Sequence, residues 1–388
     1  MNILIIPSWY PDKPGDIGGS FFREQAIALQ KSGNNVYVID ATADLPNTSF
    51  VKSFFNAKRI HDQGLIVYKQ RIQTRGMARI PEPNLVYYRK RVEHLYELML
   101  KHEGNINIDV IHAHSWFPAG VVACEIGKKY GIPVVITEHF SGILKGELDS
   151  KRVKYLKYCT NNADAFICVG NALADKVSEY TGCDRTKLQV IPNMYSHIFE
   201  NISIPKKVGN NFTFFSVGSL IPRKRHSQLL RCFANAFSVD DDVRLLIGGD
   251  GELRDELQKQ IDDLDIGDRA KLLGQLSREQ VVENMTRANA FVLTSSFETF
   301  GVVYIEALAC GLPLIGSRNG GAQDIINGHN GILVDVDNDE QLTEALIKMR
   351  ENIGSYNYKA LQEYAKDNFS EEAVVRELTE VYKKLVRA

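Results

Sequence analysis

Short apolar runs recur along the first half of the chain and alternate with longer segments in which apolar residues follow a helical period. The runs have the length of buried β-strands, and the segments between them have the length of helices. One such helix follows the loop that ends at Gly19 and carries Phe22, Ala26 and Leu29 on one side. Strands separated by helices predict a parallel, doubly wound sheet. The predicted strands are 2–6, 35–39, 109–112, 133–137, 165–169 and 188–191, with further helices at 85–102, 119–130, 151–159 and 172–180.

The same alternation restarts in the second half, after residues 192–211, which lack periodicity and are predicted to be a linker. The fold class is therefore α/β, with two Rossmann-like domains. We expect one domain to comprise residues 1–194 together with a C-terminal helix at 370–388, and the other to comprise residues 195–369. Sheets of this kind bind ligands beyond the carboxyl ends of their strands, which predicts a shared central cleft. The second set of predicted strands is 212–217, 243–247, 270–273, 290–293, 312–315 and 331–334, followed by helices over 355–388.

Composition narrows the classes of function. A net charge of -2 over 388 residues argues against nucleic acid as the main partner. The first residues, MNILIIP, lack the basic start of a signal peptide, and no stretch approaches the roughly 18 apolar residues of a membrane span. The six cysteines show no metal-type spacing and are expected to be reduced thiols. Together these features predict a cytoplasmic protein.

One region departs from this balance of charge. Residues 51–101 hold eleven Lys or Arg and four Asp or Glu, and the basic run is densest from Arg89 to Arg91, beside two tyrosines. Such an excess suits peripheral contact with anionic lipid headgroups at the inner face of a membrane. An ordinary basic surface is the alternative.

The stretch from Thr294 to Gly311 holds two glutamates at the start of an apolar helix. Glu306 sits alone among apolar side chains there, and a buried carboxylate is costly unless something hydrogen-bonds to it. The helix begins near Gly301, where unpaired backbone amides and the helix dipole favour an anion. This pattern indicates a site for hydroxyls and phosphate. Alternatively, Glu298 complements the helix N-terminus and Glu306 meets a buried Arg or Tyr.

Arg223 and Lys224 lie where the first strand of the second half leads into a helix. Two adjacent cations at such a turn repel each other unless an anion binds them both. A diphosphate leaving group is one such anion. The alternative is a pair of solvated charges that cap a turn.

Two features of the first half face the same predicted cleft. Gly18 and Gly19 lie between the first strand and helix, where backbone amides can approach a phosphate, although glycine-rich turns also simply connect elements. His139 directly follows an apolar strand, in a position where a histidine is either structural or catalytic.

Three further patterns are not interpreted as functional sites. His112 and His114 have the form of a metal pair, but no third ligand is spaced with them, so packing and loop hydrogen bonds are expected. Asp263 and Asp265 match a metal-binding Asp-x-Asp only in form and are predicted to lie on a solvated face. The glycine-rich turn from Gly248 to Gly251 is similar to the phosphate turn of some kinases but lacks the Thr that follows it there.

The segment from Glu298 to Glu306 (ETFGVVYIE), followed by ALACGLP, resembles the retaining GT-B-fold glycosyltransferases of family 4, the glycosyl transferases group 1. The resemblance runs nearly end to end. It implies that Glu306 binds the ribose hydroxyls of a nucleotide-sugar donor and that Glu298 faces the donor sugar. Many relatives carry Arg where this chain has Ser219, and Arg223 is the candidate replacement. The resemblance implies catalytic roles for His139, Lys224 and Glu298, and donor contacts from Gly18, Gly19, Arg223, Lys224, Gly274, Gln275, Leu276, Glu298, Phe300, Gly301, Val302, Val303 and Glu306.

The activity implied is transfer of a hexosyl or N-acetylhexosaminyl group, with retention and without a metal or other cofactor. The donor would be a nucleotide-diphosphate sugar, with UDP favoured, and the acceptor a saccharide or lipid-linked saccharide in cell-surface polysaccharide or glycolipid synthesis. A sugar-nucleotide 2-epimerase of the same fold is the first alternative. A dinucleotide oxidoreductase lacks its fingerprint glycines here, and a non-catalytic nucleotide-binding module remains open.

Overall fold

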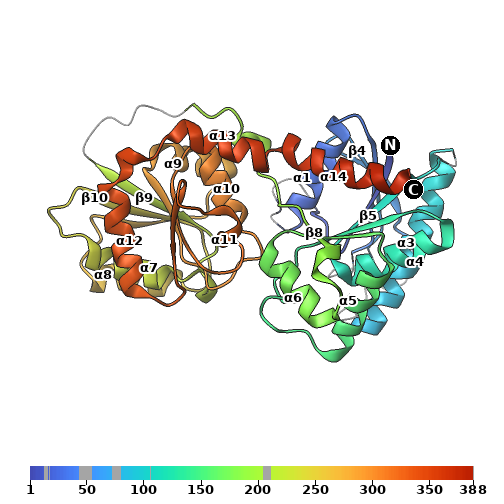
Figure 1. The fold of residues 1–388 in the computed structure, drawn as a ribbon, viewed down its shortest axis with the longest axis horizontal. Helices are drawn as coiled ribbons and strands as arrows, with labels where there is room; N and C mark the ends of the chain where they lie inside the picture. Colours follow the sequence, from blue (N-terminus) through green and yellow to red (C-terminus); the bar gives the residue numbers. More distant parts are fainter. Residues whose placement is uncertain are drawn as a thin grey trace. The chain divides into compact units, whose positions relative to one another are not determined.

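The computed structural model describes residues 1–12, 16, 18–42, 55–71, 80–104, 106–203 and 211–387. The chain divides into two compact units (Figure 1). Unit 1 comprises Met1–Pro192 and Val374–Ala388, and unit 2 comprises Asn193–Ala373. Each unit is built on its own sheet with helices beside it, so the predicted α/β class with two Rossmann-like domains is confirmed.

Unit 1 holds a sheet in which β1 is central and entirely apolar at its core positions, from Ile3 to Ile6. The described strands follow the order β3 (Lys58–Asp62), β4 (Leu65–Lys69), β2 (Asn35–Asp40), β1 (Asn2–Pro7), β5 (Val110–His114), β6 (Val134–Glu138), β7 (Ala165–Cys168) and β8 (Leu188–Val190). The accompanying helices are α1 (Ser20–Lys31), α3 (Pro81–His102), α4 (Val121–Tyr130), α5 (Ser150–Asn162), α6 (Asn171–Thr181) and, from Val374 onward, α14 (Glu371–Val386).

The expectation of a purely parallel first sheet is wrong at one edge, where β3 pairs antiparallel with β4. These two strands were not predicted at all. No apolar run indicates them, because β3 (KRIHD) is polar and mostly exposed, as is common for an edge strand. Gln63 and Gly64 both have positive φ, of 50° and 92°, which is the geometry of a tight two-residue hairpin turn.

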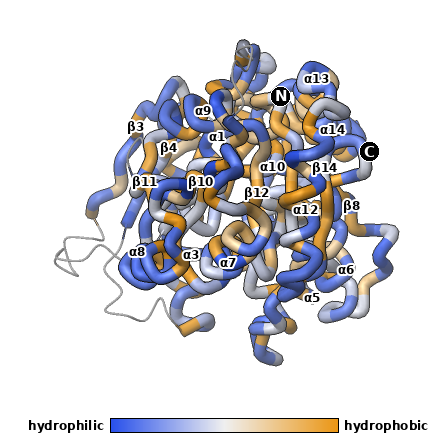
Figure 2. Tube along the Cα trace, turned by 90° about the vertical axis from the view of Figure 1, so that its left-hand side faces the viewer, coloured by the Kyte–Doolittle hydropathy of each residue, from blue (hydrophilic) through white to orange (hydrophobic). Residues whose placement is uncertain are grey.

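Unit 2 holds a wholly parallel sheet among its described residues. Its core is rich in phenylalanine, and the rings of Phe214, Phe233 and Phe237 pack together. Figure 2 shows the contrast along the chain, with β12 and β14 mainly hydrophobic and α8 mainly hydrophilic. The strand order is β11 (Ala270–Gly274), β10 (Val243–Gly248), β9 (Phe212–Val217), β12 (Ala290–Leu293), β13 (Leu314–Ser317) and β14 (Gly331–Val334). The helices are α7 (His226–Ala236), α8 (Arg254–Asp263), α9 (Arg278–Arg287), α10 (Val302–Ala309), α11 (Ala322–Ile325), α12 (Asp339–Glu351) and α13 (Tyr358–Phe369).

The predicted linker at 192–211 is ordered over the part that the structure describes, and it packs within unit 2. Met194, Tyr195 and Phe199 are buried, and the Tyr195 amide donates to the carbonyl of Phe369 at 3.1 Å. Lack of periodicity therefore did not mean lack of packing, because these side chains contact distant segments. The remaining predicted linker residues 204–210 lie outside the described residues. None of the described helices is both long and apolar enough to cross a bilayer.

Candidate active site

The turn after β9 carries Arg223 and Lys224, and loop residues beyond β12 hold its backbone in place. The Ser296 amide donates to the carbonyl of Arg223 at 2.9 Å. The Thr294 hydroxyl lies 3.4 Å from the Lys224 carbonyl and 3.3 Å from the Arg225 carbonyl. Arg225 adopts the left-handed conformation with φ 57°, which lets α7 begin immediately at His226. The two predicted cations are thus fixed to the strand that precedes Glu298.

The Glu298 carboxylate binds both cations. One oxygen accepts from Lys224 Nζ at 2.6 Å and the other from Arg223 Nη1 at 3.1 Å. The Glu298 side chain is 11% exposed, the Lys224 side chain 12% and the Arg223 side chain 29%. Burial opposes ionisation, but Lys224 and Arg223 outweigh it and hold the pKa of Glu298 below its usual value.

This ion triad, Arg223–Lys224–Glu298, corrects the argument made from the sequence alone. That argument required an external anion to bind the two cations, whereas the protein itself supplies the Glu298 carboxylate. One carboxylate cannot neutralise two cations, so the triad keeps a net charge of +1. It therefore remains attractive to an anion of higher charge, such as a diphosphate.

Helix α10 holds Glu306 among apolar side chains, as expected. Tyr304, Ile305, Ala307 and Leu308 are fully buried, whereas Val302 and Val303 are partly exposed. Glu306 follows Val302 by one helical turn and lies on the same face, with 9% of its surface accessible. Glu306 is thus a buried carboxylate within an apolar helix, as the sequence predicts.

The start of α10 is fixed by Gly301, with φ 92°. A Cβ at this position would lie 2.7 Å from the ring of Tyr304, whose hydroxyl donates to the Leu293 carbonyl at 2.9 Å. Phe300 beside it is buried. The glycine thus allows α10 to start close against the end of β12.

The glycine-rich turn after β10 interlocks with the turn after β9. A Cβ on Gly249 would lie 1.9 Å from the carbonyl oxygen of Gly218, and the Gly218 amide donates to Gly248 at 3.0 Å. The Gly249 amide in turn donates to Gly274 at 2.8 Å. Leu276 packs on Gly248, while Gln275 is exposed. The glycines here permit close approach of backbones, and this brings Gly274, Gln275 and Leu276 beside the turn that leads to Lys224.

In unit 1, the predicted residues gather around the start of α1. Gly19 caps that helix with φ 78°, and a Cβ on it would meet Trp9 at 3.0 Å. Gly18 is exposed, with open space where a Cβ would be. One turn later, Phe21 and Phe22 each place their ring centroid 5.0 Å from that of His139. The structure therefore brings His139 close to the loop of Gly18 and Gly19.

Glu138, which was not predicted to have a role, organises the loop around His139. Its buried carboxylate accepts from the backbone amides of Trp116, His139 and Phe140 at 2.7, 2.8 and 2.6 Å. Burial raises the pKa of Glu138 to about 7, although these donors favour the charged form. A carboxylate directly after an apolar strand is the signal that could have indicated this role.

The histidine pair of unit 1 was expected to be structural, and the Asp-x-Asp of unit 2 was expected to lie on a solvated face. His112 and His114 are buried, and His112 is hydrogen-bonded on both nitrogens, as the packing interpretation predicted. Asp263 and Asp265 are exposed. Among the described residues, no group of three His, Cys, Asp or Glu side chains is arranged to hold a metal.

In the described part of the basic region, several cations are buried or paired with carboxylates. Arg89 makes two bonds of 2.6 Å to Glu125, Arg91 is buried, and Lys90 alone of this run is exposed. Lys69 and Arg71 both pair with Asp12 and Asp40. Local counting of charge missed these partners because they come from distant segments.

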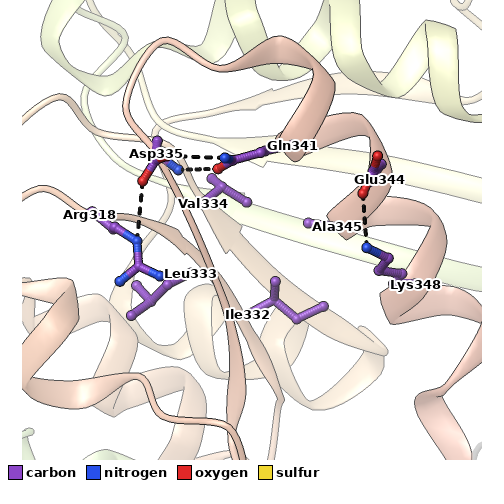
Figure 3. Close-up of a pocket in the computed structure, with 9 residues that line it drawn as sticks. All are labelled: Arg318, Ile332, Leu333, Val334, Asp335, Gln341, Glu344, Ala345 and Lys348. Atoms are coloured by element: carbon purple, nitrogen blue, oxygen red, sulfur yellow. Dashed lines mark hydrogen bonds and ion pairs between the residues drawn. The ribbon is translucent and has the colours of Figure 1, made fainter.

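A pocket between β14 and α12 contains none of the predicted site residues (Figure 3). Its charged side chains are paired with one another, Arg318 with Asp335 at 3.2 Å and Lys348 with Glu344 at 2.9 Å. It offers no unpaired charge to a ligand and is not a candidate for the chemistry.

Known protein families match both halves of the chain. The family model of Glycosyltransferase Family 4 matches residues 18–197, and that of glycosyl transferases group 1 matches residues 198–368. An uncharacterised glycosyltransferase of Methanocaldococcus jannaschii is 30% identical over 282 residues, which cover 72% of this chain and 76% of the relative.

Solved structures show the same fold. Sucrose-phosphate synthase from Thermosynechococcus elongatus has a TM-score of 0.75 at 20% identity, with 99% of each chain covered. Anabaena HepE in complex with UDP has a TM-score of 0.72 at 21% identity, with 99% of this chain and 100% of that chain covered. Two parallel-sheet Rossmann-like units of this kind define the GT-B class of fold. The chain belongs to the glycosyltransferases of family 4, the glycosyl transferases group 1.

Proposed function

We propose that the protein transfers a sugar from a nucleotide-diphosphate sugar to an acceptor hydroxyl, with retention of the anomeric configuration and without a metal. The observation that carries the proposal is the ion triad, in which one carboxylate holds two cations at the carboxyl end of the unit 2 sheet. Its net charge of +1 suits a leaving diphosphate, whose negative charge grows as the bond to the sugar breaks.

The donor lies along unit 2 in this proposal. Glu306 accepts hydrogen bonds from the ribose hydroxyls, one helical turn after the partly exposed Val302. The start of α10 at Gly301 and the amides near Phe300 favour the diphosphate. Gly274, Gln275 and Leu276 contact the base. Lys224 and Arg223 exchange part of their contact with Glu298 for the diphosphate, and this frees Glu298 to face the donor sugar.

Unit 1 supplies the remaining groups. Gly18 and Gly19 offer backbone amides to the diphosphate, and His139 lies beside the reacting sugar. The departing phosphate takes the acceptor proton, so no separate general base is needed. UDP is the favoured nucleotide because the similar HepE structure contains UDP. The acceptor is a saccharide or lipid-linked saccharide, presented to a cytoplasmic enzyme that touches the membrane at most peripherally.

A thermal-shift screen with UDP, GDP, ADP and their sugars tests the donor. A ligand at 100 times its dissociation constant stabilises a fold by about 2.7 kcal/mol, so the correct nucleotide raises the melting temperature clearly above the other two. Acceptor-dependent release of that nucleotide from its sugar then establishes transfer. Release without an acceptor, with a sugar inverted at C2, identifies an epimerase instead. Binding with no release under any condition identifies a non-catalytic module.

A further inference from the structure

The hydroxyl of Tyr382, on the last helix α14, reaches a histidine in the middle of the unit 1 sheet. It lies 2.6 Å from His112 Nδ1, and His112 Nε2 lies 2.7 Å from the hydroxyl of Thr137 on the neighbouring strand. Both rings are fully buried. Burial lowers the pKa of His112 to about 3, so the imidazole is neutral, with one nitrogen donating and the other accepting. Its orientation is fixed at both ends.

His114 continues this arrangement toward the candidate active site. It follows His112 by two residues in β5, so both side chains lie on the same face of the sheet. The two ring centroids are 4.4 Å apart, and His114 also stacks on Phe22 at 4.6 Å. Its Nδ1 lies 3.3 Å from His139 Nε2. Four rings, Tyr382, His112, His114 and His139, therefore form one connected series.

Packing alone does not explain this series. Burying an imidazole costs free energy wherever a nitrogen lacks a partner, and His114 Nε2 has no hydrogen bond in the part of the chain that the structure describes. An apolar ring at position 114 would stack on Phe22 equally well without that cost. What only a histidine supplies is Nδ1, and that atom faces His139. At this contact the two imidazoles must carry complementary tautomers, because one nitrogen has to donate and the other to accept.

We propose that Tyr382, His112 and His114 are positioning residues for His139. The Tyr382 hydroxyl holds His112, His112 and Phe22 hold the ring of His114 between them, and His114 Nδ1 sets the orientation and tautomer of the His139 imidazole. The proposal rests on the proposed function, since it gives His139 its place beside the reacting sugar. It extends that function to a helix at the far end of the chain.

Tyr382→Phe tests the first contact of the series. We expect turnover to fall roughly 3- to 10-fold, the effect of one lost buried hydrogen bond, with the KM for the donor unchanged. Tyr68→Phe is the matched control, because the Tyr68 hydroxyl also makes a 2.6 Å bond in unit 1, to Glu103, which lies outside the series. It should lower the melting temperature to a similar degree and leave turnover unchanged. Equal turnover losses in both variants would overturn the proposal.

His114 is tested by a pair of variants. His114→Phe keeps the stacking and removes Nδ1, so turnover should fall at least as far as in Tyr382→Phe. His114→Asn places an amide near the former Nδ1 and should recover part of the loss, although it packs less well. If the phenylalanine variant is the more active of the two, the stacking alone matters and the proposal is wrong.

The imidazole signals of His139 in NMR spectra provide a readout that does not depend on activity. Tyr382→Phe and His114→Phe should both shift them, whereas Tyr68→Phe should not. Unmoved His139 signals in the first two variants would contradict the proposal even if transfer is established. Shifted signals in a protein that transfers no sugar would instead show that the positioning holds and the proposed function fails.

Discussion

Two buried clusters, one in each unit, satisfy their polar groups in different ways. In unit 1, His112 and His114 are neutral imidazoles, of which His112 hydrogen-bonds to two hydroxyls and His114 stacks on Phe22. Unit 2 uses full charges, which neutralise one another in the ion triad except for one positive charge. Each ring nitrogen of His112 has a protein partner, so this ring needs no ligand. The triad is only partly satisfied, and this difference indicates which side gains most from a bound anion.

The two clusters also differ in whether a bound ligand would change their hydrogen bonds. The imidazoles of His112 and His114 keep their partners whether or not a ligand is present. The bonds of Glu298 to Lys224 and Arg223 can be exchanged for bonds to a diphosphate at little net cost, because charge-assisted bonds replace charge-assisted bonds. We therefore expect substitutions in the triad to affect catalysis most.

The largest effect is expected for Lys224→Ala. Turnover should fall about 100- to 1000-fold, the range for removing one donor from a developing anion, while binding of the free nucleoside changes little. Steady-state kinetics and nucleoside titration measure the two quantities. Lys348→Ala is the control, since it removes a lysine paired with Glu344 on the surface of α12. Equal losses of turnover and nucleoside affinity would show that Lys224 only anchors the ground state.

The two glutamates of the candidate site, Glu298 and Glu306, should respond differently to the same chemical change. Glu306→Gln weakens two charge-assisted bonds to ribose, so donor affinity should fall roughly 10- to 1000-fold without loss of apo stability. Glu298→Gln leaves Lys224 and Arg223 without a counter-charge and should lower the free energy of unfolding by about 2 to 3 kcal/mol. Nucleotide titration and denaturant unfolding of both variants check this.

The dependence of stability on pH provides a further test of Glu298. Because the pKa of folded Glu298 is lowered, its stabilisation is present above the ordinary value of 4.5 and is lost as pH falls toward the folded value. Glu298→Gln should therefore flatten the dependence of stability on pH below 4.5. If Glu306→Gln unfolds the apo protein while nucleotide still binds normally, the assignment of Glu306 to ribose is wrong.

A smaller effect is expected at His226, the one place where unit 2 buries an imidazole beside the triad. Both ring nitrogens lack a hydrogen bond within the described ranges, and burial together with nearby Lys224 lowers the pKa of His226 to about 4. His226→Leu should raise the free energy of unfolding at pH 7 by about 1 to 2 kcal/mol.

The sign of the pH effect provides the check. The folded pKa is depressed, so the stability of the wild type is full above pH 6.5 and declines as pH falls through 4, and His226→Leu should lack this contribution. Hydrogen exchange of α7 at pH 7 and pH 5 measures it. A leucine variant that is less stable at both values would mean that His226 has a partner after all.

Strand positions were predictable from the sequence because apolar runs are local. The strands β9, β12 and β14 have the predicted bounds, and most others differ at one end by one or two residues. The hairpin of β3 and β4 was missed because an edge strand needs no apolar run. The sequence motifs singled out Lys224, Glu298 and Glu306 as candidates but did not predict that Glu298 pairs with Lys224 and Arg223. Those depend on contacts such as Arg223 with Glu298, which are 75 residues apart in sequence.

The interlocked turns of Gly218 and Gly249 limit how this enzyme can change over evolutionary time. Any side chain at position 249 would collide with the backbone of Gly218, so the position cannot vary whatever nucleotide is bound. The exposed side chain of Gln275, on the next turn along, meets no such restriction. If Gln275 contacts the base as proposed, a lineage that adopts a new nucleotide would acquire its substitutions in the turn after β11, while Gly249 in the turn after β10 stays the same.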